Sequence, residues 1–87
     1  MRIHELKTHR QYFGEIERGQ KTWELRKDDR GGFEVGDRLH LREFDADTGT
    51  YTGRHREMLV EVMWVRTDLP GGLEEGYVIL DIRTEKR

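Results

Sequence analysis

Residues Glu57–Val65 read EMLVEVMWV, an apolar run that only Glu61 interrupts. So little alternation is typical of a central strand that is covered on both faces. The last apolar run, YVILDI at Tyr77–Ile82, predicts a second buried strand. The segment between them, RTDLPGGLEEG, is expected to be a loop, because Pro70 cannot join a ladder of hydrogen bonds.

Three segments nearer the N-terminus add strands that alternate or are short. Arg38–Phe44 sets Leu39 and Leu41 opposite its polar residues, and the stretch DADTGTYTG that follows is typical of a hairpin turn. Thr22–Arg26 alternates as well, which predicts a half-buried strand with Trp23 and Leu25 on the core side and Thr22, Glu24 and Arg26 on the other side. Arg2–Leu6 is expected to be an edge strand or an extended arm.

A helix over about His9–Arg18 is predicted from three local signals. Thr8 and Gln11 have the spacing of a capping box, and Gly19 stands where a left-handed C-terminal cap is wanted. The apolar residues between them, Tyr12, Phe13 and Ile16, share one side of the helix. The loop KDDRGGFEVGDRL after the second strand carries an apolar clip, Phe33 and Val35, and Thr84–Arg87 is expected to be a frayed tail.

These elements predict an α+β fold: a small closed or nearly closed β-barrel of about five strands, with one N-terminal helix packed at its side. The 87 residues fit one domain, 1–87, and recurring apolar clusters indicate a folded chain despite 39% charged residues. Without cysteine, a signal peptide or a long apolar run, we expect a cytoplasmic protein that does not enter a membrane. The four histidines lack metal-ligand spacing, so neither a metal nor a cofactor is expected.

Two motifs stand in order along this chain: G-x-K-x-x-E-x-R, and later F-x-V-G-D-x-L. The first is met by Gly19, Lys21, Glu24 and Arg26, and the second by Phe33, Val35, Gly36, Asp37 and Leu39. With these motifs, the stretch from about Leu6 to Ile82 resembles the ASCH domains of the PUA-like superfamily, in particular a small phage and bacterial branch without assigned function. The resemblance implies a PUA-like barrel with a cleft beside the helix, where the charged motif faces RNA or a nucleotide.

The charged motif has chemistry suited to a nucleotide. Lys21 and Arg26 could hold anionic groups, Arg26 with its planar fork, and Glu24 could accept the protons of a base amine. The residues alone favour an exposed Glu24–Arg26 ion pair, and it is the resemblance that favours a pocket. Weaker candidates for ligand contact are Thr22, Arg38, His40 and Tyr77.

A basic cluster and the aromatic residues extend this prediction. Arg38, His40 and Arg42 share a strand face, and Arg54, His55 and Arg56 follow the hairpin, so they could contact phosphates or form a solvated face balanced by Glu43, Asp45 and Glu57. Trp23 and Trp64 are expected in the core rather than on a base-stacking surface.

Two other functions stay open. Some small ASCH proteins are amidohydrolases that act on N4-acylated cytidine, which would make Lys21 and Glu24 catalytic. Their motif, however, has Thr where this chain has Glu24, and their late glutamate would have to be Glu74 or Glu75. The third hypothesis is a phage or bacterial protein-interaction domain, which predicts an exposed apolar patch and no salt-sensitive affinity for RNA. In all three cases we expect a monomer.

Overall fold

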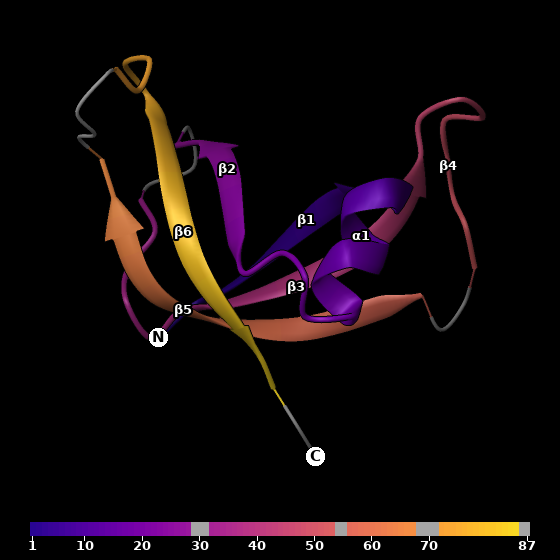
Figure 1. The fold of residues 1–87 in the computed structure, drawn as a ribbon, viewed down its shortest axis with the longest axis horizontal. Helices are drawn as coiled ribbons and strands as arrows, with labels where there is room; N and C mark the ends of the chain where they lie inside the picture. Colours follow the sequence, from indigo (N-terminus) through magenta and orange to yellow (C-terminus); the bar gives the residue numbers. More distant parts are fainter. Residues whose placement is uncertain (29–31, 54–55, 68–71, 86–87) are drawn as a thin grey trace.

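The computed structural model describes residues 1–28, 32–53, 56–67 and 72–85, which form a curled, mostly β structure with one short helix (Figure 1). The elements are β1 (Ile3–His9), α1 (Arg10–Glu17), β2 (Trp23–Lys27), β3 (Arg38–Asp45), β4 (Thr50–Tyr51), β5 (Glu57–Arg66) and β6 (Tyr77–Thr84). Five of the strands are those predicted from the sequence, and the two-residue β4 completes the predicted hairpin with β3.

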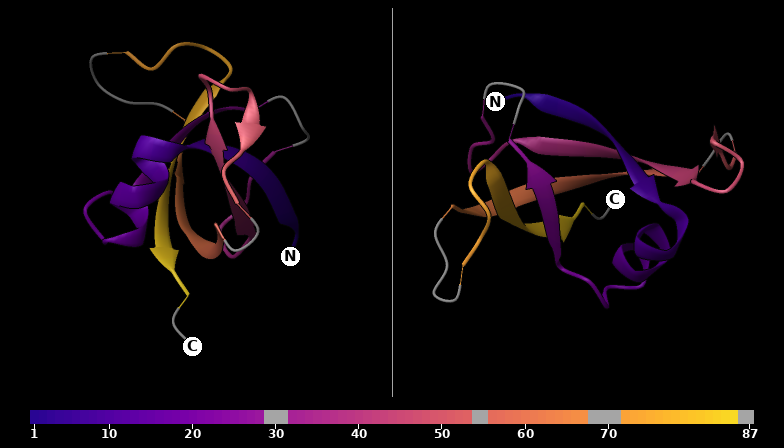
Figure 2. Two further views of the ribbon diagram at one scale, coloured as in Figure 1. Left: turned by 90° about the vertical axis from the view of Figure 1, so that its right-hand side faces the viewer. Right: turned by 90° about the horizontal axis from the view of Figure 1, so that it is seen from above.

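The strands form one sheet in the order β1-β3-β5-β6-β2, with β4 paired to β3. β1 runs parallel to β3, and the other pairs are antiparallel. The sheet curls into a half-barrel in which α1 lies between the end of β1 and the segment leading to β2 (Figure 2). The predicted barrel is therefore an open one: β1 and β2 are the two edges of the sheet, and no ladder pairs them within the described residues.

The core fills the concave side of this sheet. Its buried residues are Leu6, Phe13, Ile16, Phe33, Leu39, Leu41, Val60, Val62, Val78, Leu80 and Ile82. Strands β3 and β6 bury every second residue over most of their length, as their alternation requires. The predicted inward position of Leu39 and Leu41 is confirmed.

Helix α1 lies within one residue of its predicted limits at each end. Its C-terminus is a Schellman motif: Gly19, at φ 76°, donates from its N–H to Ile16 O, and the Gln20 N–H donates to Glu15 O. The predicted capping box is wrong, because Thr8 still belongs to β1 and His9 occupies the N-cap without a side-chain hydrogen bond.

The predicted faces of two strands are wrong. In β2 the order is inverted, since Trp23 and Leu25 are 46% and 48% exposed while Glu24 is only 3% exposed. In β5 the register shifts between Val62 and Trp64, and Trp64 lies opposite Asp81 on the outer face with 56% of its surface exposed. Alternation gives the period of a strand but not which of its faces meets the core.

Loop and tail predictions have mixed outcomes. Phe33 is buried as expected, but Val35 is exposed. Thr84 ends β6 rather than starting a frayed tail, and the Glu85 N–H donates to Leu59 O at 3.2 Å. Predictions that fall on Asp29, Gly31, Arg54, His55, Pro70, Gly71, Lys86 and Arg87 lie outside the described residues.

The F-x-V-G-D segment is anchored by Asp37, which is almost completely buried. Its carboxylate accepts hydrogen bonds from His4 Nε2 at 2.8 Å and from the N–H groups of Arg2 and Glu34 at 3.1 and 3.0 Å. Burial alone would raise the pKa of Asp37, but these hydrogen bonds outweigh it and lower the pKa from 3.8 to about 2. The motif residue thus ties the start of β1 to the loop before β3.

Within the described part of the chain, α1 is too short and too polar to cross a bilayer, and it is the only helix there.

Candidate ligand-binding cleft

A cleft of about 540 Å³ lies where the sheet is open, between the edge strands and beside α1. It is lined by Lys7, Thr8 and His9 from the end of β1, Tyr12 and Glu15 from α1, and Gln20, Lys21, Trp23, Glu24, Leu25 and Arg26 from the segment through β2. A second hollow of about 400 Å³ shares Lys7 and Arg26 with it, so the opening continues along the seam between β1 and β2. The volume of the first cleft is in the range of small-molecule sites.

The three ionic residues of the first motif meet in this cleft. Glu24 projects inward from β2, and its two oxygens are held separately: Oε1 by Lys21 Nζ at 3.2 Å and Oε2 by Arg26 Nε at 2.8 Å. Glu24 is nearly buried, whereas Arg26 keeps about a quarter of its side-chain surface exposed. Glu24 therefore orients both cations, and the exposed part of the motif is cationic.

Lys21 is also held by aromatic rings. Its Nζ lies 4.2 Å from the ring centroid of Tyr12 and 4.7 Å from that of Trp23. Both rings are about half exposed, at 47% and 46%, so they offer flat apolar surface at the cleft. A carboxylate and two ring faces are all partners of a cation.

Arg26 joins the two edges of the sheet. Its Nη2 donates to Lys7 O at 2.6 Å, which connects β2 to β1 where no backbone ladder does. Two of its five N–H groups are used in these contacts, and the other three make no hydrogen bond with a described residue. A guanidinium with spare N–H groups at a cleft wall is suited to a phosphate or carboxylate.

Thr8 is the one buried polar side chain of the described residues without a partner. Thr8, Glu24, Asp37 and Glu43 are the buried polar residues there, and the three acidic ones are all hydrogen-bonded. Thr8 is 1% exposed, and its Oγ1 makes no hydrogen bond. Buried hydroxyls are normally satisfied, and Thr8 lines the cleft, so a ligand could supply the missing contact.

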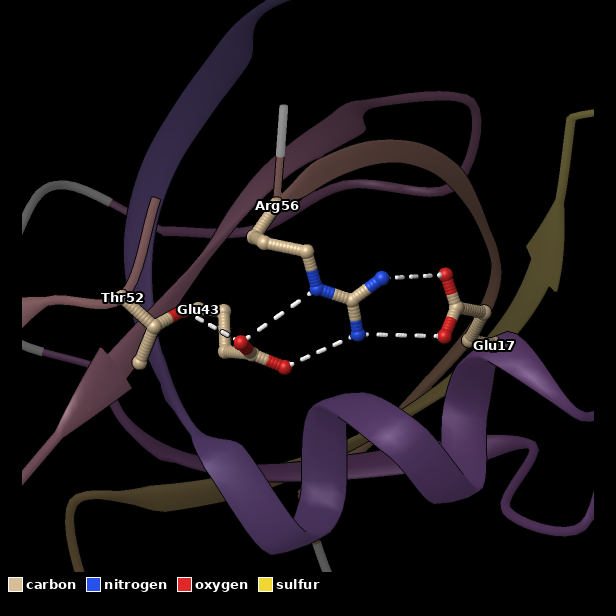
Figure 3. Close-up of polar contacts among 4 residues, drawn as sticks. All are labelled: Glu17, Glu43, Thr52 and Arg56. Carbon is tan, nitrogen blue, oxygen red and sulfur yellow. Dashed lines mark hydrogen bonds and ion pairs between the residues drawn. The ribbon is translucent and has the colours of Figure 1, made fainter. Parts of the chain in front are cut away.

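A separate polar network fixes α1 against the sheet (Figure 3). Arg56 reaches Glu43 Oε2 at 3.0 Å and both oxygens of Glu17 at 3.1 and 3.2 Å, and Thr52 also donates to Glu43. The hydrogen bonds from Arg56 lower the pKa of the buried Glu43, and those to Glu43 and Glu17 raise the pKa of Arg56. Because α1 carries Tyr12 and Glu15, this network also sets one wall of the cleft.

Residues 3–82 of the chain match DUF3850, a domain of unknown function. The chain belongs to the DUF3850 family. It is also 42% identical over 79 residues to the uncharacterized 12.9 kDa protein in the GpA 3′ region of Escherichia phage P2. The matched part covers 91% of this chain and 66% of the phage protein, so the DUF3850 chain spans just under two thirds of that relative.

Of the seven ligand-binding residues predicted from the sequence, the structure brings three together in the DUF3850 cleft: Lys21, Glu24 and Arg26. Thr22 is exposed beside them and accepts a hydrogen bond from Ile82 N through its carbonyl oxygen. Tyr77 lies elsewhere, opposite Lys27, with about 13 Å of strand between Lys27 and Trp23.

Arg38 and His40 also lie apart from the cleft, on the outer face of β3. Arg38 pairs with Glu85 at 2.5 Å, and His40 lies 3.4 Å from Glu57. Arg42, on the same face, pairs with Glu5 at 3.0 Å. The structure therefore favours the balanced strand face over the phosphate track, although only Glu57 of the three predicted acidic partners lies on that face.

Sequence reasoning missed five cleft residues that come from β1 and α1, namely Lys7, Thr8, His9, Tyr12 and Glu15. The sequence pattern predicts Thr8 as part of a capping box and Tyr12 on the apolar side of the helix. The spacing of these residues could have indicated the cleft. Leu6 and Thr8 lie two residues apart on one strand face, and Tyr12 and Glu15 lie three residues apart on one helix face.

Proposed function

We propose that this protein is an RNA- or nucleotide-binding module of the ASCH type, with a PUA-like half-barrel whose cleft holds one nucleotide. One observation carries the proposal: Lys21, Glu24 and Arg26 converge on a concave site that also contains the unpartnered hydroxyl of Thr8. Such convergence of polar groups in a cleft is what a small-molecule site requires.

The parts of a nucleotide match the parts of the cleft. The spare N–H groups of Arg26, together with Lys7 and Lys21, suit the phosphate. The half-exposed rings of Tyr12 and Trp23 suit a stacked base. Charge agrees with this, since the described lining of the cleft contains three cationic residues, Lys7, Lys21 and Arg26, and two acidic ones, Glu15 and Glu24, a balance of one positive charge when histidine is neutral.

The surroundings favour a single nucleotide or a chain end over a long strand of RNA. Three cations outside the cleft, Arg38, Arg42 and Arg66, are each paired with a carboxylate. A strand that contacted these cations would have to displace those ion pairs, whereas a mononucleotide needs only the cleft. Cytoplasmic RNA and nucleotide pools would supply either ligand.

Fluorescence titration tests the proposal, because Trp23 borders the cleft. Nucleoside monophosphates should change the emission with saturable binding, and Lys21→Ala should weaken that binding at least tenfold, since it removes a cation that Glu24 and two rings hold in place. Arg83→Ala is the matched control, because Arg83 is an exposed cation paired with Glu61 outside the cleft. Absence of saturable binding to any nucleoside monophosphate would refute the proposal.

An amidohydrolase is a second candidate, because a lysine and a carboxylate stand 3.2 Å apart in the cleft. The late glutamate is its weak point: Glu74 and Glu75 precede β6 at the Lys27 end of β2, away from Lys21. Incubation with N4-acetylcytidine decides the matter. Release of cytidine by the wild-type protein and not by Lys21→Ala would establish hydrolysis.

The protein-interaction candidate is favoured by exposed apolar side chains along β2 and β5. Trp23 and Trp64 both lie opposite Asp81 in the β2-β6-β5 ladder, and Leu25 extends the apolar surface along β2. If these side chains are the functional surface, Trp64→Ser should abolish partner binding, and the wild-type protein should show no salt-sensitive affinity for RNA.

A further inference from the structure

The two carboxylates of the cleft, Glu24 and Glu15, differ in whether their oxygens are free to accept hydrogen bonds from a ligand. Both oxygens of Glu24 already accept from Lys21 and Arg26, and the residue is only 3% exposed. Glu15 lines the same cleft from α1 and is partly exposed. Its carboxylate makes no hydrogen bond or ion pair with any other described residue.

The helix directs Glu15 towards the same space as the aromatic wall. Glu15 follows Tyr12 by three residues, so the two side chains share a face of α1. The backbone around Glu15 is fixed, since its carbonyl oxygen accepts from the N–H groups of Gln20 and Lys21 at 2.9 and 3.1 Å. The Arg56 network holds the helix itself, so the position of Glu15 is set before a ligand arrives.

A free carboxylate in a cleft accepts hydrogen bonds and cannot donate one when ionised. It matches the exocyclic amine of cytosine or adenine and is repelled by the carbonyl oxygen that uracil or hypoxanthine carries at the same position. Thr8 adds a hydroxyl that can donate or accept, so it does not reverse this preference.

We infer that Glu15 is the specificity-determining residue of the cleft and selects an amino-bearing base, cytosine or adenine, while Glu24 is a positioning residue that aims Lys21 and Arg26 at the phosphate. This inference rests on the proposed nucleotide binding. It reassigns the base amine, which sequence reasoning gave to Glu24, to a residue that sequence reasoning did not consider.

The experiment compares four ligands, cytidine, uridine, CMP and UMP, against the wild-type protein and two glutamine variants. Wild-type protein should bind CMP about tenfold or more tightly than UMP. Glu15→Gln should bring that ratio close to one, because an amide can donate to the uracil oxygen as well as accept from the cytosine amine. AMP and IMP, run in parallel, test the same preference in a purine.

Glu24→Gln should change the ratio of the affinities for CMP and cytidine, which measures the contribution of the phosphate. Without the Glu24 carboxylate, Lys21 and Arg26 lose the partner that orients both of them. The affinity for CMP relative to cytidine should therefore fall several-fold, while the preference for cytosine over uracil persists. Glu24→Asp, which keeps the charge, should recover part of that relative affinity. If the role of Glu24 were purely structural, Glu24→Gln would lower the affinity for all four ligands by the same factor.

Glu34→Gln is the control for loss of one negative charge, because Glu34 is exposed and precedes β3 at the opposite end of β1 from Thr8. Glu34→Gln should leave the CMP to UMP and the CMP to cytidine affinity ratios unchanged. If Glu15→Gln leaves the CMP to UMP ratio unchanged, or if wild-type protein prefers UMP, the assignment of Glu15 is overturned and cleft binding stands. If no ligand binds wild-type protein, the nucleotide proposal itself fails.

Discussion

Thr8→Val should make the protein more stable and a weaker binder. The substitution keeps the shape and β-branching of a strand residue and removes only the hydroxyl, which is 1% exposed and makes no hydrogen bond. An unsatisfied buried hydroxyl costs about 1 to 3 kcal/mol. We therefore expect the free energy of unfolding to rise by about 1 kcal/mol, equivalent to about 4 to 8 °C in Tm for a domain of this size.

The affinity should change in the opposite direction. If a bound nucleotide satisfies Thr8 Oγ1, its loss removes one hydrogen bond, worth about 0.5 to 1.5 kcal/mol or roughly a 2- to 12-fold increase in Kd. Thr8→Ser is the complementary substitution, because it keeps the hydroxyl and removes the methyl group, which leaves a methyl-sized void. It should lose about 1 kcal/mol of stability and retain nucleotide affinity.

Urea unfolding and fluorescence titration of the same samples measure both effects. Thr67→Val, at an exposed position after β5, controls for the substitution itself and should lie within about 0.5 kcal/mol of the wild-type protein. A Thr8→Val protein that is destabilised by more than that margin would show that the hydroxyl is already satisfied in the free protein. The argument for a ligand at Thr8 would then be refuted.

Three further predictions concern the framework of the cleft. Asp37 has a pKa of about 2 in the fold against an ordinary 3.8, so it contributes about 2 kcal/mol of stability above about pH 5 that is lost as the pH falls towards 2. Asp37→Asn should flatten that acid limb of the urea-unfolding profile, and an unchanged limb would contradict the assignment. Arg56→Met should lower the free energy of unfolding by about 2 kcal/mol, because it leaves Glu43 buried without its cation. In thermal melts, the double variant Arg56→Met with Glu43→Leu should recover part of that loss. Gly19→Ala should cost about 1 kcal/mol, since the φ of 76° strains any residue with a Cβ, and equal melting temperatures would argue against the Schellman cap.

The sequence allowed the order of elements to be predicted because each element carried a local signal. The alternation of Arg38–Phe44 and the Gly19 cap both describe interactions within a few residues, and both predictions are confirmed. The capping box failed for a different reason: Thr8 is drawn into the parallel pairing of β1 with β3, opposite Glu43, so the strand lasts to His9. Tertiary pairing therefore outweighed the local capping signal.

The inverted face of β2 had a physical cause that lies outside the strand. Hydrophobicity placed Trp23 and Leu25 inside, yet they are exposed, because the inner side of β2 meets the polar seam next to β1 rather than the apolar core. Glu24 can be buried there only because Lys21 and Arg26 accompany it. The spacing of the charged motif was therefore a better guide to the inner face than the apolar residues were.

The incomplete closure of the sheet explains why polar groups gather at this place. Had β1 and β2 formed a ladder, their backbone groups would have satisfied each other and the barrel would have had no open edge. In this chain a single guanidinium, from Arg26 to the carbonyl oxygen of Lys7, spans the gap where the structure describes both strands. The hydroxyl of Thr8 and the carboxylate of Glu15 border the same gap, and neither has a partner among the residues that the structure describes. A ligand with a phosphate at one end and an amine at the other would supply hydrogen bonds that the missing ladder does not, which makes the seam, rather than the outer face, the place where binding gains most.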